Sequence, residues 1–166
     1  MRERGLQAAL ALLYIYLLSK QSHMTLKQLI KLENEAKEVW VISPTLHYDT
    51  ENKDFSELVS VNLGQKTKYR YIVPATAQIE KNLQRYKKIY NMTDKDIAAY
   101  FLLLPASEFT PFITEIAIYN ASTDCIACAA PATDDSNEVI RFKDESAKAM
   151  AKSFVALWKK YMRTKP

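Results

Sequence analysis

A chain of 166 residues, 48% of them hydrophobic and 25% charged, has the length and composition of one globular domain, which excludes a disordered or fibrous protein. The net charge of +4 is modest and spread along the sequence, so we do not expect the concentrated basic stripe of a nucleic-acid-binding protein. With only two glycines and neither a G-x-G-x-x-G nor a G-K-S/T motif, a glycine-rich phosphate loop is excluded, and no cofactor is expected.

Residues 1–24 differ from the rest of the chain, because they contain an uncharged and largely apolar run from Leu6 to Leu18. As a helix, the uncharged stretch would be about 22 Å long at 1.5 Å per residue. A hydrocarbon core of about 30 Å requires roughly 20 residues. Three interpretations stay open: a short membrane anchor through residues 5–20, an oligomer-forming helix, and a helix packed on its own domain. The sequence Ser22-His23-Met24 also resembles a cloning junction.

The anchor interpretation predicts a membrane-associated protein with a cytoplasmic domain, and the other two allow a cytoplasmic protein. Residues 25–166 are predicted to form the folded domain. Thr25 is expected to cap a helix with apolar residues on one face. The elements predicted after it are a strand at Val39–Ser43, a helix capped by Asp54 and ended by Gly64, a strand at Tyr69–Val73, a helix at 76–90, a short helix from Thr93 to Tyr100 and a strand at Phe101–Leu104.

The second half of the chain contains three further predicted strands, near 113–119, 124–129 and 138–142, and a closing helix at 144–162. Strands alternate with helices in the first half and follow one another in the second. This order predicts an α/β fold in which a mixed β-sheet is flanked by helices, preceded by the hydrophobic N-terminal helix.

Two cysteines, Cys125 and Cys128, form a single C-x-x-C within an apolar, β-like run. Residues three apart on a strand point to opposite faces, so the pair cannot easily share a metal ion. The only histidines are His23 and His47, which leaves a zinc site short of ligands. We therefore expect core cysteines and no metal site.

Polar side chains follow the first predicted strand, where Ser43, Thr45, His47 and Tyr48 lie close together in the sequence. In α/β sheets, ligands bind beyond the carboxyl ends of the strands. These four residues are therefore candidates for ligand binding. The alternative is a solvated surface loop without a specific role.

Arg70 is a second candidate for ligand binding, because it lies within an otherwise apolar predicted strand. A charge in that position is costly unless it is paired or faces a polar cavity. Its guanidinium group could hold a carboxylate or a phosphate, with Lys68 and Tyr69 beside it. The alternatives are an arginine at the edge of the sheet and a buried ion pair with Glu115 or Glu138.

Glu115 and Glu138 complete the candidate site residues. Two carboxylates on neighbouring predicted strands are compatible with acid–base chemistry or with a divalent cation. The companion Asp and Asn residues of a metal cage are missing, so structural hydrogen bonding is the alternative.

Residues 112–142 carry a pattern with a known counterpart. The stretch Phe112–Asn120 has the spacing H-x-K-x4-D, with Ile113 at the histidine position, Glu115 at the lysine and Asn120 at the aspartate. Ala127–Ala130 stands where G-S-x-N would follow. In spacing and element order, the chain resembles a degenerate half of a phospholipase D-like domain. It is also similar to the sensor domains of TrmB-type regulators and of bacterial signalling proteins.

The resemblance implies a phospholipase D-like fold without the histidine nucleophile and the lysine that stabilises phosphate oxygens. From these replacements we predict that the chain is not an enzyme. The implied function is a sensor or interaction domain that binds a small anionic or nucleotide-like ligand and signals through homo-oligomerisation. Two alternatives stay open: a nucleoside- or nucleotide-processing enzyme that uses Glu115 or Glu138, and a membrane pore- or filament-forming subunit assembled through residues 5–20.

Overall fold

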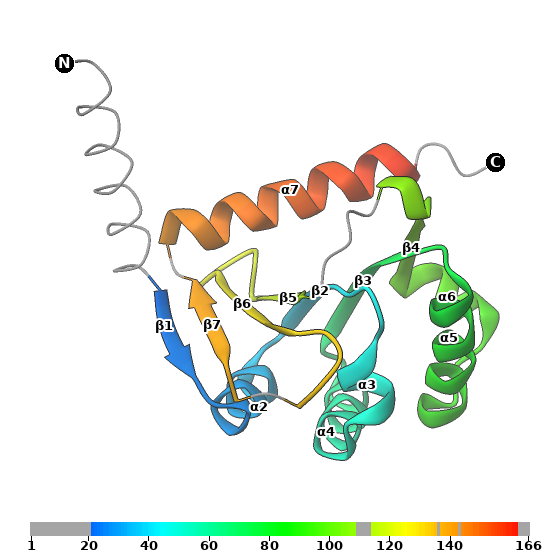
Figure 1. The fold of residues 1–166 in the computed structure, drawn as a ribbon, viewed down its shortest axis with the longest axis horizontal. Helices are drawn as coiled ribbons and strands as arrows, with labels where there is room; N and C mark the ends of the chain where they lie inside the picture. Colours follow the sequence, from blue (N-terminus) through cyan, green and yellow to red (C-terminus); the bar gives the residue numbers. More distant parts are fainter. Residues whose placement is uncertain (1–20, 109–113, 136, 143, 163–166) are drawn as a thin grey trace.

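A single mixed sheet organises the part of the chain that the computed structural model describes, which is residues 21–108, 114–135, 137–142 and 144–162 (Figure 1). Within these residues the sheet has seven strands in the order β1-β7-β6-β5-β2-β3-β4. The strands are β1 (Gln21–Met24), β2 (Glu38–Ile42), β3 (Lys68–Pro74), β4 (Phe101–Leu104), β5 (Thr114–Tyr119), β6 (Ile126–Pro131) and β7 (Val139–Phe142). Strands β2, β3 and β4 are parallel, and all other pairings are antiparallel. The predicted mixed α/β sheet is confirmed.

Helices cover both faces of this sheet. One face carries α2 (Leu26–Glu35), α3 (His47–Glu51), α4 (Lys53–Gly64), α5 (Ala77–Tyr90) and α6 (Asp94–Tyr100), and the other face carries α7 (Asp144–Met162). Figure 1 shows α7 lying across the sheet on the side opposite to α2–α6. A short 3-10 turn, η1 (Ala106–Glu108), follows β4. The parallel strands are joined through helices because a parallel pair needs a long crossover.

Each face of the sheet has its own apolar core, set by the alternation of side chains along the strands. On β3, Tyr69 and Tyr71 point towards the α2–α6 layer, while Ile72 points towards α7. Trp40 and Phe154 stack in the core beneath α7, with their ring centroids 4.9 Å apart. This contact confirms the predicted apolar face of the closing helix.

The helix caps agree with the sequence in one place and differ in another. Thr25 caps α2 through a capping box with Gln28, as predicted. Asp54, however, does not cap α4: the side chain of Asn52 accepts a hydrogen bond from the backbone N–H of Phe55 at 2.9 Å, so the helix begins at Lys53. The segment 45–53, expected to be a loop, contains the short helix α3. Five residues are too few to show helical periodicity in a sequence.

The N-terminal prediction is only partly testable, because residues 1–20, with the apolar run, lie outside the described residues. Gln21–Met24 were assigned to the N-terminal segment, but they form β1 and pair with β7 in the domain's own sheet. Among the described residues, no helix combines the length and apolar character needed to cross a membrane. The two cysteines lie in different cores, as predicted, with Cys128 buried and Cys125 half-buried.

Candidate functional sites at the two ends of the parallel strands

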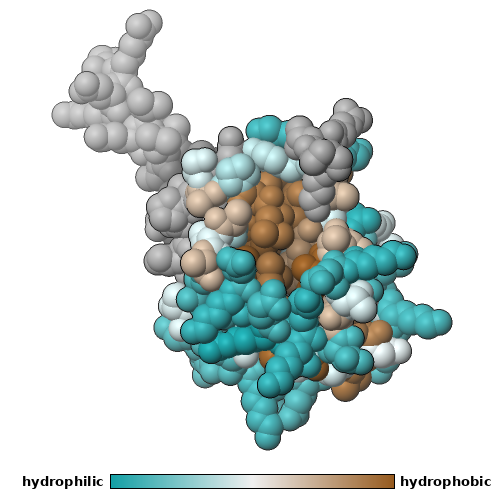
Figure 2. All heavy atoms as spheres, turned by 90° about the vertical axis from the view of Figure 1, so that its right-hand side faces the viewer, coloured by the Kyte–Doolittle hydropathy of each residue, from teal (hydrophilic) through white to brown (hydrophobic). Residues whose placement is uncertain are grey.

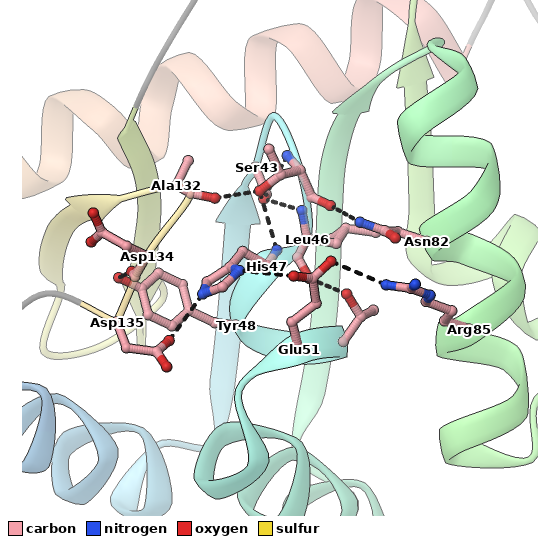
Figure 3. Close-up of polar contacts among 12 residues, drawn as sticks. Ser43, Leu46, His47, Tyr48, Glu51, Asn82, Arg85, Ala132, Asp134 and Asp135 are labelled. Carbon is pink, nitrogen blue, oxygen red and sulfur yellow. Dashed lines mark hydrogen bonds and ion pairs between the residues drawn. The ribbon is translucent and has the colours of Figure 1, made fainter.

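The loop after β2 is held at the carboxyl ends of the parallel strands by side chains on both sides of it (Figure 3). The hydroxyl oxygen of Ser43 accepts hydrogen bonds from the backbone N–H groups of Thr45 and Leu46, at 3.3 and 2.8 Å. Asn82 on α5 donates to the carbonyl oxygen of Thr45 at 2.6 Å. The Thr45 hydroxyl donates to the carbonyl oxygen of Ala132, which follows β6. The loop is therefore a fixed part of the domain.

Both ring nitrogens of His47 face carboxylates. Its Nε2 lies 2.9 Å from Asp135, and its Nδ1 lies 3.4 Å from Glu51. Glu51 also accepts a hydrogen bond from Arg85 at 3.1 Å. The hydrogen bonds that Asn52 and His47 make to Asp135 lower the pKa of that carboxyl group. His47 is thus part of a network of polar contacts that joins α3, α5 and the β6–β7 connection (Figure 3).

Glu115 lies directly beneath this loop, at the position that the resemblance assigned to lysine. Burial first, and then the charge of Asp49, raise its pKa well above the usual value, and a hydrogen bond from Ser43 opposes the shift. Its Oε2 atom is buried and has no hydrogen-bond partner among the described residues. A cavity of about 20 Å³ adjoins Glu115, Asp49 and Tyr48. That volume accommodates about one water molecule.

Two further carboxyl groups line the same cavity and were not predicted as site residues. Glu33 accepts hydrogen bonds from the hydroxyl groups of Tyr69 and Tyr119 at 2.9 and 3.1 Å, and Asp49 accepts one from Tyr71 at 2.8 Å. Burial, reinforced by the charge of Asp49, raises the pKa of Glu33 to about 7. Burial likewise raises the pKa of Asp49 to about 6. Glu33 follows the apolar residue Leu29 by four positions, so the two side chains lie on the same buried face of α2. That spacing was the signal in the sequence for the burial of Glu33.

Arg70 lies on the opposite face of the sheet from Glu115 and His47, so the seven predicted ligand-binding residues do not form one site. The carbon of its guanidinium group lies 5.7 Å from the ring centroid of Trp40 and 5.6 Å from that of Trp158. The ion pairs of the described residues do not include Arg70. The alternative of a buried pair with Glu115 or Glu138 is therefore not realised.

A basic pocket of about 340 Å³ lies beside Arg70, at the amino ends of β2 and β3. Its cationic walls are Lys66, Lys68 and Arg70, and its lining also includes Glu38 and Tyr100. The carboxylate of Glu38 accepts hydrogen bonds from the backbone N–H and the hydroxyl of Ser122, at 3.3 and 2.9 Å. The one acidic side chain of this lining is thus already engaged. A partial signal for this pocket was present in the sequence, since Lys68 and Tyr69 directly precede Arg70.

Glu138 belongs to neither end of the parallel strands. Its side chain is exposed just before β7 and lies 3.8 Å from Nδ1 of His23. Within the described ranges, no group of three or more His, Cys, Asp or Glu side chains is arranged to hold a metal ion. The structure therefore brings Ser43, Thr45, His47, Tyr48 and Glu115 together, while Arg70 and Glu138 each stand apart.

The described sheet has three parallel strands followed by an antiparallel meander, with α7 on the other face, and this arrangement agrees with the predicted phospholipase D-like fold. The fold is similar to that of a solved structure, polyphosphate kinase from Porphyromonas gingivalis, with a TM-score of 0.53 and 11% sequence identity. The similarity covers 90% of this chain and 27% of the kinase chain. No family model matches the sequence, and no curated protein is significantly similar to it.

This similarity corrects one prediction. We predicted from Ile113 and Glu115 that the chain is not an enzyme, but the structure that resembles it is a kinase. The prediction rested on treating this fold as inactive wherever the histidine and lysine positions are replaced. Two substitutions in one motif exclude only the chemistry of that motif, and Ile113 itself lies outside the described residues. The prediction is therefore wrong.

Proposed function

We propose that this chain is a phospholipase D-like sensor domain that binds a small anionic ligand in the basic pocket at the amino ends of β2 and β3. The observation that carries the proposal is the position of Arg70 and the absence of an acidic partner for it among the described residues. Its guanidinium group lies against two tryptophan rings and is absent from the ion pairs of the described residues, and the residue itself lines a pocket of about 340 Å³. Arginine side chains held in this way are suited to carboxylate and phosphate groups.

The surroundings of Arg70 support the same charge preference. Two lysines add to the positive potential of the pocket, and Glu38 directs its carboxylate to Ser122. The volume lies in the range of small-molecule sites, roughly 300 to 1,000 Å³. The carboxyl end of the sheet is instead rich in acidic residues, because Glu115 and Asp49 are buried there and Asp135 lies beside His47. An anion is thus favoured at the amino end.

The sensor part of the proposal requires a way to transmit binding, and we propose self-association through the free edge of the sheet. Strand β4 is the last strand in the order, and Leu103 on it is 41% exposed. Figure 2, which faces this side of the domain, shows a hollowed apolar strip bordered below by hydrophilic side chains. An uncharged apolar edge strand is a template for pairing with a second copy. Anchoring through residues 5–20 would confine such pairing to a membrane surface.

Calorimetric titration with inorganic phosphate, citrate and adenosine monophosphate tests the anion site. The Arg70→Ala variant is expected to lose binding of whichever anion the unaltered protein binds. Arg85→Ala is the matched control, because Arg85 lies at the carboxyl end of the sheet and pairs with Glu51. Circular dichroism checks that each variant is folded, and Arg70→Lys separates loss of charge from loss of the guanidinium geometry. Equal affinities in the unaltered protein and in Arg70→Ala contradict the proposal.

A second candidate function is favoured by one specific observation, the unpartnered Oε2 atom of buried Glu115. A buried carboxyl group with a raised pKa, beside a second carboxyl group, is the arrangement that general acid–base chemistry uses. The corresponding activity would be processing of a nucleoside at the carboxyl end of the sheet, and it would require the loop after β2 to open, because the cavity beside Glu115 holds about one water molecule. Release of free base from a nucleoside panel, followed by chromatography, tests it. Glu115→Gln should abolish any turnover, whereas Glu138→Gln, at an exposed position, should leave it unchanged.

A further inference from the structure

A second hollow lies between α7 and the sheet, next to the basic pocket. It has a volume of about 350 Å³ and is lined by Trp40, Ala121, Lys148, Ala151, Lys152 and Val155. Four of these six side chains are apolar, and the two lysines belong to α7. The hollow therefore combines an apolar surface with a positively charged border, whereas three of the nine residues that line the basic pocket are cationic.

Two contacts connect the hollow to the basic pocket. Trp40 lines the hollow and Arg70 lines the pocket, and the guanidinium carbon lies 5.7 Å from the centroid of the indole ring. Glu38 lines the pocket and hydrogen-bonds to Ser122, whose chain neighbour Ala121 lines the hollow. The linings of the two spaces therefore meet where Arg70 lies against Trp40, and the hydrogen bond between Glu38 and Ser122 links them a second time.

We infer that the ligand of the basic pocket carries an apolar ring or acyl group next to its anionic group, and that this apolar part occupies the hollow beneath α7. The inference rests on the proposed anion-binding function and specifies the chemical class of the ligand. The anion contacts Arg70 and Lys68, and the apolar part covers Trp40, Ala121 and Val155. Burying apolar surface contributes about 25 cal/mol per Å², so an apolar part raises the affinity over that of the anion alone.

The two lysines at the border of the hollow restrict the chemical class of the ligand further. Lys152 is exposed on the border of the hollow and takes no part in the ion pairs of the described residues, while Lys148 pairs with Glu145 at 3.6 Å. A ligand with a cationic apolar part would meet like charges at this border. Neutral or acidic substituents on the apolar part fit the site, and amines do not.

The test compares two probes by calorimetry on the full chain: methyl phosphate, which carries only the anion, and 1-naphthyl phosphate, which adds an aromatic body. We expect 1-naphthyl phosphate to bind at least tenfold more tightly. Ala121→Tyr is expected to remove this advantage without weakening methyl phosphate binding, because the larger side chain fills the hollow from a turn. The control is Ala156→Tyr, at an exposed position of α7 outside the lining.

The outcomes separate the two proposals. If both probes bind the unaltered protein with equal affinity, the inference about the apolar part is overturned and the anion site stands. If Ala121→Tyr leaves the advantage of 1-naphthyl phosphate intact, the apolar part lies elsewhere and the inference is again overturned. If neither probe binds the unaltered protein, the proposed anion-binding function fails, and this inference fails with it.

Discussion

The domain is expected to lose stability as the pH rises towards neutrality, because the pKa of Glu33 is higher in the folded state than in the unfolded state. This side chain is fully enclosed between α2 and the sheet, and its hydrogen-bond partners are the neutral hydroxyl groups of Tyr69 and Tyr119. Burial, with a further contribution from the charge of Asp49, raises its pKa from 4.5 to about 7. No cation is among the groups that shift it.

The sign and the size of the effect follow from proton linkage. Between about pH 4.5 and about pH 7, the folded state binds more protons at Glu33 than the unfolded state does, so the free energy of unfolding falls as the pH rises. The stabilisation is complete below the unfolded pKa and is lost through the folded pKa. At 1.36 kcal/mol per pKa unit, this shift corresponds to about 3 kcal/mol. The raised pKa of Asp49, about 6, acts in the same direction at lower pH.

Urea unfolding at intervals from about pH 5 to about pH 8 measures this slope. Glu33→Gln removes the titrating group and keeps an amide oxygen for the tyrosines, so its stability should depend less on pH than that of the unaltered protein. Glu35→Gln is the control, because Glu35 is exposed on the same helix and should leave the slope unchanged. Identical slopes for Glu33→Gln and the unaltered protein would refute the reasoning.

Two other predictions concern the start of α4 and the edge of the sheet. Asn52→Ala should lower the free energy of unfolding by about 1 kcal/mol, since α4 loses its capping side chain. Asp54→Ala should lower it less, and thermal unfolding of both variants measures the difference. Equal losses would argue against Asn52 as the cap. Leu103→Lys should shift the protein towards monomers in analytical ultracentrifugation, since it places a charge on β4. Val61→Lys, at an exposed apolar position on α4, should not; an unchanged distribution for Leu103→Lys would exclude the β4 edge as the interface.

The helices and strands that were predicted well are those in which the pattern of apolar residues along the sequence also determines which side packs against the rest of the domain. The closing helix has an apolar stripe over several turns, and α7 packs against the sheet through that stripe. The strands β3 and β4 are short apolar runs, each followed closely by proline, and they begin and end within a residue or two of the prediction. By contrast, α3 is shorter than two helical turns, so no periodicity could identify it.

Most members of the candidate site were predictable because they are neighbours in the sequence, and Glu115 was predicted from its place in the motif of residues 112–120. Ser43, Thr45 and His47 share one loop, and the structure keeps them together. The contact between His47 and Asp135 spans 88 residues and depends on where β6 ends relative to β2. A single sequence does not contain that sheet order. Arg70 was grouped with Glu115 for the same reason, although their strands present these two side chains to opposite faces.

Glu115 shares its surroundings with two other buried carboxyl groups, and this affects where an anion can bind. Glu115, Asp49 and Glu33 surround a cavity of about 20 Å³, so ionising one of them raises the cost of ionising the next. An anionic ligand at this end would add to the repulsion, whereas at the amino end it meets Arg70 and two lysines. The anion site that we propose at the amino end avoids this repulsion.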